Sequence, residues 1–121
     1  MYKYYFEKLD VWQLSKDLIK SIYRLTSGLP GSEKYGLISQ TQRASVSIAS
    51  NIAEGSARIT AKDQANFTMM AYSSAMELLS LLIVANELGF LSDAEDHELR
   101  TKIDAIAQKL NVLRKAQLSN N

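Results

Sequence analysis

Residues that interrupt helices and strands are rare in this chain. It contains one proline, Pro30, and five glycines, at positions 28, 31, 36, 55 and 89. A β-sheet protein needs turn residues at intervals of roughly 8–12 positions. The segment 56–88 contains neither glycine nor proline. This spacing excludes an all-β fold and predicts long helices.

Apolar and small side chains recur between these breaks with the periodicity of amphipathic helices. In the segments 11–25 and 37–52 they advance in steps of three and four residues, and over 99–113 the two steps alternate strictly. Strict alternation is typical of helices packed in a bundle. The sequence therefore predicts an all-α fold, an antiparallel up-down four-helix bundle.

The length and composition fit one globular domain. The chain has 121 residues, of which 46% are hydrophobic and 22% are charged. We expect a single domain over residues 1–121, with a short N-terminal arm at 1–8 and a frayed tail at 118–121. The first residues, Met1–Tyr5, lack the apolar segment of a secretory signal. We therefore expect a cytoplasmic protein.

Capping residues indicate where the four helices begin and end. Hydroxyl and carboxylate side chains accept hydrogen bonds from the free amides at a helix start, whereas proline and glycine end helices. The expected boundaries are an N-cap at Asp10, a stop at Pro30, a second helix over 33–54 stopped by Gly55, a cap at Thr60, a left-handed stop at Gly89, and a capping box of Ser92 and Glu95.

Charge is nearly absent from the two middle helices. Arg43 is the only charged residue in 39–53, and Glu77 is the only one in 64–86. An outer helix of a monomeric bundle normally carries several charges on its polar face. Serine and threonine interrupt the third helix, for example at Thr68, so we do not interpret it as a membrane span. We favour a homo-oligomer over a monomer that exposes an apolar patch, and we expect no membrane partner.

The two isolated charges are candidate partners. If the middle helices run antiparallel about the turn at 56–60, Arg43 and Glu77 lie at the same level. A partly buried pair of this kind is retained only with good geometry. We favour a structural ion pair that sets the register of the helices. The alternative is a polar cluster that lines a cavity of the oligomer.

Basic residues are concentrated toward the two ends of the sequence. Residues 1–62 carry nine bases and five acids, 63–99 carry seven acids and no base, and 100–121 carry five bases and one acid. The outer faces of the first and fourth helices could merge into one surface that binds phosphates. The sequence alone favours an ordinary solvated face, since acids are interspersed and the net charge is only +1. The candidate nucleic-acid contacts are Lys16, Lys20, Arg24, Lys102 and Lys109.

Aromatic residues are concentrated near the N-terminus. They could stack on nucleic-acid bases, as aromatic side chains do in single-strand binding proteins. The interpretation that we favour is that they cover one end of the bundle and exclude water from its core. The residues concerned are Tyr2, Tyr4, Tyr5, Phe6 and Trp12.

The residues needed for catalysis are missing. The chain has no cysteine and a single histidine, His97, which excludes thiolate metal sites and any site with two imidazoles. Asn51 and Glu54 lie one turn apart, but they more readily organise the helix end than form a site. No glycine-rich phosphate loop or serine–histidine–aspartate set is present. We predict a protein that is not an enzyme, with no cofactor, no metal and no small-molecule substrate.

Six segments of the chain carry recognisable motifs: 6–12 (FEKLDVW), 29–37 (LPGSEKYGL), 40–48 (QTQRASVSI), 51–55 (NIAEG), 71–78 (AYSSAMEL) and 86–91 (NELGFL). Together they resemble the 23S rRNA intervening-sequence protein family of small bacterial four-helix bundle proteins. The similarity extends over nearly the whole chain, and the stretch that runs from Ser47-Ile48 into 51–55 is specific to the family.

The resemblance implies more about structure than about function. Relatives form homopentamers around a central channel, no catalytic activity is established for them, and their association with RNA is inferred from gene location. A related accessory protein of diversity-generating retroelements has the same bundle and pentamer. Members often have two adjacent arginines where this chain reads Gln42-Arg43, which removes one positive charge. The motif residues carried over are Arg43, Asn51, Glu54, Gly55 and Glu77.

Two functions are therefore expected, in order of preference. The first is a non-catalytic ring of copies, a homopentamer, whose basic outer surface binds RNA or another nucleic acid. The second is an oligomeric scaffold that binds a protein partner through the channel mouth or the acidic region 63–99, with no role for nucleic acid.

Overall fold

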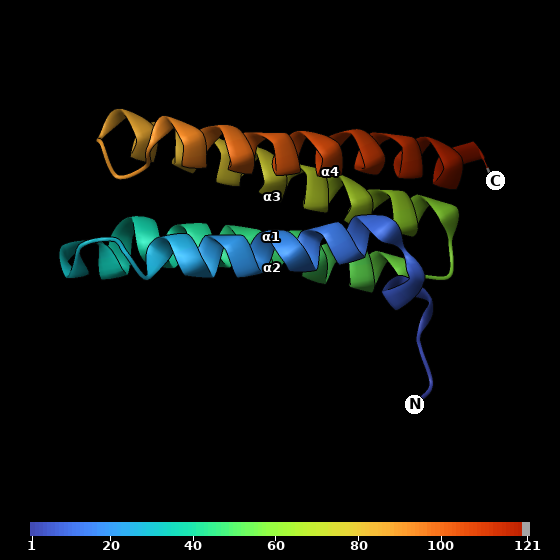
Figure 1. Ribbon diagram of the computed structural model, residues 1–121. Coiled ribbons are helices and arrows are strands. Elements are labelled where there is room, and N and C mark those ends of the chain that lie inside the picture. Colours follow the sequence, from blue (N-terminus) through green and yellow to red (C-terminus); the bar gives the residue numbers. More distant parts are fainter. Residues whose placement is uncertain (120–121) are drawn as a thin grey trace.

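Four long helices make up most of the computed structural model, which describes residues 1–119 (Figure 1). Three short helical turns precede α1 and α2, and the described residues contain no β-strand. The prediction of an all-helical chain with four helices is confirmed. The elements are a 3-10 turn at Tyr5–Lys8, α1 at Asp10–Thr26, a 3-10 turn at Gly31–Glu33, a π turn at Lys34–Ile38, α2 at Ser39–Ser56, α3 at Ala61–Glu87 and α4 at Asp93–Ser119.

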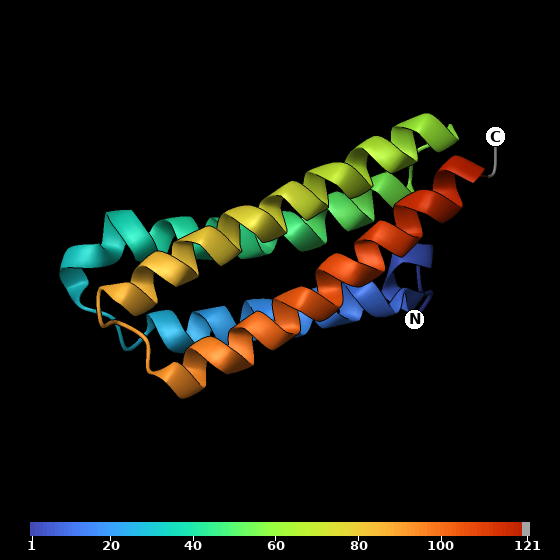
Figure 2. The same ribbon diagram turned by 90° about the horizontal axis from the view of Figure 1, so that it is seen from above.

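The helices lie in two layers, with α3 and α4 over α1 and α2 (Figure 1). Each helix is followed by one that runs in the opposite direction, and the last helix returns beside the first (Figures 1 and 2). Two ion pairs between α1 and α4 agree with this antiparallel arrangement. Lys109 of α4 pairs with Asp10, and Lys102 pairs with Asp17, seven residues further along α1.

The core is formed by aliphatic side chains from all four helices. Burying each leucine or isoleucine contributes about 1.5–3 kcal/mol to the stability of the fold. The predicted apolar positions of the fourth helix are buried as far as Leu110, but Leu14 of the first helix is 36% exposed. The buried stripe of α1 passes through Ser15 instead, whose hydroxyl donates to the Val11 carbonyl. The largest fully buried apolar side chains are Leu18, Ile22, Ile48, Leu78, Leu82, Ile103, Ile106 and Leu110.

Three of the predicted helix boundaries are confirmed. Thr60 caps α3, since its hydroxyl accepts a hydrogen bond from the Asp63 amide at 3.1 Å. Gly89 has φ +83°, the left-handed conformation that ends a helix. At the start of α4, the Glu95 amide donates to the Ser92 hydroxyl at 3.1 Å, and the Ser92 amide donates to the Glu95 carboxylate at 2.9 Å. These three boundaries could be predicted from the sequence because each depends on residues within one helical turn.

Other predicted boundaries are wrong. The N-cap of α1 is Leu9, and Asp10 is the first helical residue, with its carboxylate bound to Lys109. The second long helix begins at Ser39 and not at position 33, because the chain departs from helical geometry at Gly36 (φ −108°, ψ −109°). α4 extends through Ser119, so the expected tail is helical at 118 and 119, and its last two positions lie outside the described residues.

Gly55 does not stop the second helix, as the sequence had predicted. It lies inside α2 and is buried against α3. A Cβ atom at this position would lie 2.9 Å from the Cβ of Phe67 and 3.4 Å from the carbonyl oxygen of Gln64. Glycine is therefore required here by the close approach of the two helices, and not by a change in backbone direction.

α3 is long and apolar enough to cross a membrane, judged by length and composition alone. Its most apolar window of 18 residues has a mean hydropathy of 1.6, and 28% of that window is buried inside the bundle. The expectation that serine and threonine make α3 too polar for a span is therefore wrong by this criterion. A mostly buried core helix of a soluble protein meets the same criterion, and α3 packs against α2 and α4 but leaves most of this window unburied.

Candidate nucleic-acid interface

Three basic residues of α1 form an exposed row, which we call the basic row: Lys16, Lys20 and Arg24. They are four residues apart, so each is rotated by about 40° from the one before and all three lie on one side of the helix. Within residues 1–119, no carboxylate oxygen lies within 4.0 Å of their charged groups. The Nζ of Lys16 lies 5.4 Å from the centroid of the Trp12 ring. The basic row is therefore available to a phosphate.

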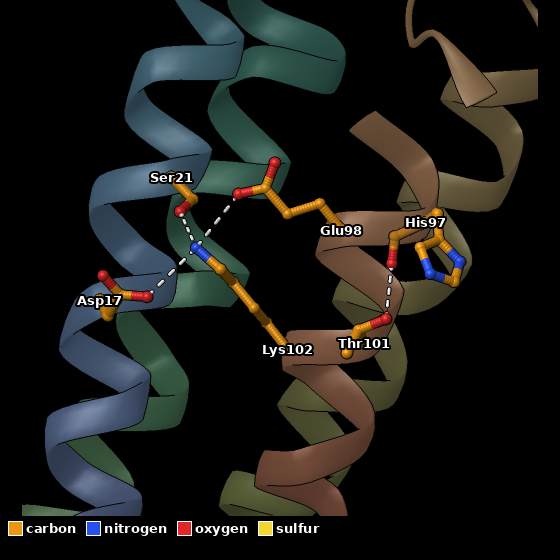
Figure 3. A network of polar contacts seen from close by, with 6 residues as sticks. All are labelled: Asp17, Ser21, His97, Glu98, Thr101 and Lys102. Carbon is orange, nitrogen blue, oxygen red and sulfur yellow. Dashed lines mark hydrogen bonds and ion pairs between the residues drawn. The ribbon is translucent and has the colours of Figure 1, made fainter. Parts of the chain in front are cut away.

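Lys102 of α4 does not join the basic row. Its Nζ lies 3.2 Å from Asp17 and 3.4 Å from Glu98, and it donates a hydrogen bond to the Ser21 hydroxyl at 2.8 Å (Figure 3). The side chain is only 28% exposed. A phosphate would have to displace two carboxylates to reach it, so Lys102 connects α4 to α1 instead.

Lys109 is neutralised in the same way. Its Nζ donates to the Asp10 carboxylate at 2.7 Å, and this hydrogen bond holds the pKa of Asp10 below its ordinary value. The predicted merger of the α1 and α4 faces into one basic surface is therefore not what the structure contains. Lysines of α4 and aspartates of α1 offset one another along the interface between the two helices.

Arg43 and Glu77 lie at the same level of α2 and α3, as the sequence predicted. The shortest distance between the guanidinium and the carboxylate is 3.8 Å, and the two side chains are 72% and 49% exposed. The expectation of a partly buried pair is wrong for the single chain. An exposed pair at this distance contributes at most about 1 kcal/mol to stability.

Asn51 has a structural role in the contact between the middle helices. Its Nδ2 donates to the Ser47 carbonyl at 2.9 Å and lies 3.1 Å from the Ser47 hydroxyl, which is 2.9 Å from the hydroxyl of Ser74 on α3. Glu54 is exposed and forms no ion pair with the described residues. Asn51 and Glu54 therefore do not form a joint site.

The outer surface of α3 is nearly uncharged. Its exposed residues recur at intervals of three and four positions along the helix, and only one of the five in the central stripe is charged. Half-buried apolar side chains, among them Met76 and Ile83, flank this stripe. The α3 stripe consists of Met70, Ser73, Glu77, Ser80 and Val84.

A groove that was not predicted from the sequence lies where α1, the π turn and α2 meet. We call it the tyrosine groove; it has a volume of about 700 Å³ and includes Tyr23, Lys34, Tyr35 and Arg43 in its lining. Both tyrosines are exposed. The signal in the sequence was the tripeptide Lys34-Tyr35-Gly36, which breaks the apolar spacing before α2.

The described residues contain no group of three histidine, cysteine or acidic side chains placed to hold a metal ion. His97 lies near the start of α4, and its backbone carbonyl accepts a hydrogen bond from the Thr101 hydroxyl at 2.9 Å (Figure 3). The N-terminal aromatics divide into two groups. Phe6 packs edge to face on Trp12, with ring centroids 5.0 Å apart, whereas the first three tyrosines are exposed.

A comparison with protein families identifies the chain. The model of the 23S rRNA-intervening sequence protein family matches residues 7–112. The chain belongs to this family. The matched range contains the basic row, the α3 stripe, the tyrosine groove and all five motif residues. No curated protein matches the chain.

The family fold is also found in a crystal structure. A protein of unknown function of the S23 ribosomal protein family, from Bacteroides thetaiotaomicron, has 21% sequence identity to this chain and a TM-score of 0.81. The match covers 87% of this chain and 98% of the other. At this identity the similarity establishes the shared fold, and neither comparison describes an enzymatic activity.

Proposed function

We propose that this family member is a non-catalytic, self-assembling bundle that binds RNA through the basic row of α1. The observation that carries the proposal is the difference between the two sets of bases. Among residues 1–119, Lys16, Lys20 and Arg24 have no carboxylate partner within 4.0 Å, whereas both α4 candidates are held by acids. Backbone phosphates supply the negative charges that the bundle itself does not provide here.

RNA is the favoured nucleic acid because of the family to which the chain belongs. The family name connects its members with sequences that intervene in 23S rRNA. Such a ligand is an RNA with paired and unpaired segments, which the protein would meet in the cytoplasm. The low net charge of +1 predicts binding that depends on local charge placement and is sensitive to salt.

Self-assembly is the second part of the proposal. The α3 stripe carries a single charge, and a surface with so little charge is typical of contacts between subunits. The resemblance described above favours a ring of five. Assembly would also strengthen RNA binding, since linked copies of a weak basic row engage one strand with a high effective concentration.

A salt titration of RNA binding tests the proposal. Affinity falls as salt rises. For each phosphate contact, the logarithm of the affinity falls by roughly 0.7 on a single strand, or 0.9 on a duplex, per unit of the logarithm of the salt concentration. Reversing the three charges of the basic row to glutamate should abolish most binding and flatten this slope. The matched control reverses three exposed bases elsewhere, Lys62, Arg100 and Lys115, with the same change in net charge.

The two outcomes separate the candidate functions. Equal loss in both triple variants would mean that only net charge matters and would contradict a role for the basic row. No binding of the wild-type protein at low salt would favour the alternative, a scaffold for a protein partner. That alternative is supported by the exposed acids at the start of α4, among them Asp93, Glu95 and Glu98.

A further inference from the structure

The tyrosine groove combines aromatic rings with positive charge at the molecular surface. Tyr35 is 86% exposed and Tyr23 is 47% exposed. The Nζ of Lys34 lies 5.5 Å from the centroid of the Tyr35 ring. An aromatic ring buries apolar surface when another ring stacks on it. Two exposed tyrosine rings in one groove are therefore available for stacking.

The charge of the groove is one-sided. Its lining includes Lys34 and Arg43 and no acidic residue. Glu77 lies 3.8 Å from Arg43 and offsets part of that charge, but no carboxylate of the described residues lies within 4.0 Å of the Lys34 ammonium. The groove therefore favours a ligand that presents flat rings together with negative charge.

The backbone holds the two tyrosines at the edge of the bundle. Tyr35 belongs to the π turn, and at the next residue, Gly36, the chain departs from helical geometry. Tyr23 projects from α1, three residues after Lys20 and directly before Arg24. Gln42 also belongs to the lining, and its Nε2 donates a hydrogen bond to the Thr26 hydroxyl at 3.1 Å. The groove is thus adjacent to the basic row along the same helix.

We infer that the tyrosine groove binds the unpaired bases of a single-stranded nucleic acid, with bases stacked on Tyr35 and Tyr23 and a backbone phosphate beside Lys34. This inference rests on the proposed function and adds the class of ligand. A duplex keeps its bases stacked inside and cannot offer them to the groove, whereas single strands and loops can. The basic row binds the phosphates of single-stranded and double-stranded nucleic acid alike, and the groove selects single strands.

Fluorescence anisotropy with two labelled probes tests the inference. The probes are a single-stranded oligouridylate of twelve nucleotides and a blunt RNA duplex of twelve base pairs. Tyr35→Ala and Tyr23→Ala should each weaken single-strand binding by roughly 5- to 150-fold, the range for loss of one base–aromatic stack. Duplex binding should stay unchanged. Tyr35→Phe should bind the single strand as the wild type does, since the phenyl ring still stacks.

The control is an exposed tyrosine outside the groove. Tyr2→Ala removes an equally accessible ring from the N-terminal segment and should leave both affinities unchanged. Tyr2 and Tyr35 are largely solvated and Tyr23 is about half exposed, so circular dichroism should report an intact bundle for every variant. Ultraviolet crosslinking of the single strand to Tyr35 gives a second readout that does not depend on affinity.

The outcomes distinguish this inference from the function on which it rests. Single-strand binding that needs the basic row but is unaffected by both tyrosine variants would overturn the groove and leave the proposed function intact. Equal loss of single-strand and duplex binding would also overturn it, because stacking predicts a difference between the two. If the wild-type protein binds neither probe, the proposed RNA-binding function itself is contradicted. Tyrosine variants that change only the sedimentation of the protein would assign the groove to contacts between copies.

Discussion

The contact between α2 and α3 and the contact between α1 and α4 are built by different means. The first contains a buried glycine, Gly55, and a pair of serine hydroxyls, with its single ion pair exposed at the rim. The second is connected by Lys102 and Lys109, which reach across to aspartates of α1. One contact therefore depends on shape and the other partly on charge.

This difference extends to the outer surfaces of the same helices. Aspartates of α1 pair with Lys102 and Lys109 of α4, whereas the basic row of the same helix has no carboxylate within 4.0 Å among the described residues. The α3 stripe has almost no charge to offer and is suited to another protein surface. The basic row proposed for RNA and the α3 stripe proposed for assembly thus lie on different helices, and the tyrosine groove adjoins the stripe where Arg43 meets Glu77.

The largest expected effect is on assembly. Ser73→Glu with Ser80→Glu introduces two carboxylates into the α3 stripe, and an unpaired charge buried at a contact costs about 3–5 kcal/mol. We expect the double variant to sediment as a 13.5 kDa monomer at concentrations where the wild type is oligomeric. The matched control, Thr101→Glu with Gln108→Glu, places the same charges on the exposed face of α4 and should leave the oligomer intact. A monomeric wild type would contradict the role of the stripe.

The next effect tests the close approach of α2 and α3. Gly55→Ala places a Cβ atom 2.9 Å from the Phe67 Cβ, and such overpacking costs about 1–3 kcal/mol. Urea denaturation should report this loss in the free energy of unfolding. Gly28→Ala is the control, since its Cβ would meet only the Leu25 carbonyl oxygen at 3.6 Å. Equal stability of the two variants would show that the helices can move apart without cost.

Gly55 also shows why part of the fold was readable in the sequence and part was not. Thr60, Gly89 and the pair Ser92 and Glu95 act within one helical turn, so their roles follow from their neighbours in the chain. The role of Gly55 depends on Phe67, which lies on the next helix. A glycine near a helix end is read as a stop unless the packing partner is known.

The candidate site shows the same limit. The basic row was predictable because its three members lie on one helix. The ion pair of Lys102 could not be predicted, because its partner, Asp17, is 85 positions earlier in the chain and meets it only after α1 and α4 pack. The tyrosine groove was missed for a similar reason, since Tyr23 and Tyr35 come together across the turn between α1 and α2.

A smaller effect is expected at the charged contact. Lys102→Met keeps the apolar stem of the side chain and removes the ammonium that joins Asp17, Glu98 and Ser21. We expect a loss of about 1 kcal/mol in the free energy of unfolding, since both carboxylates are largely exposed and solvent screens the pairs. The loss should shrink in high salt. Gly55→Ala should show no such dependence on salt, and a loss at Lys102 that is insensitive to salt would contradict the electrostatic account.

The smallest effect comes from the second lysine of that contact and depends on pH. The hydrogen bond from Lys109 lowers the pKa of Asp10 in the folded state below its ordinary value of 3.8. A lowered pKa means that the ionised form stabilises the fold, so this contribution is present above pH 4 and is lost as the pH falls through the folded pKa. Because the carboxylate is exposed, Asp10→Asn should cost only about 0.5 kcal/mol at neutral pH. The variant and the wild type should become equally stable in acid, whereas a constant difference at all pH values would mean that Asp10 acts through hydrogen bonding alone. Asp104→Asn, on an exposed aspartate without an ion pair among the described residues, is the control.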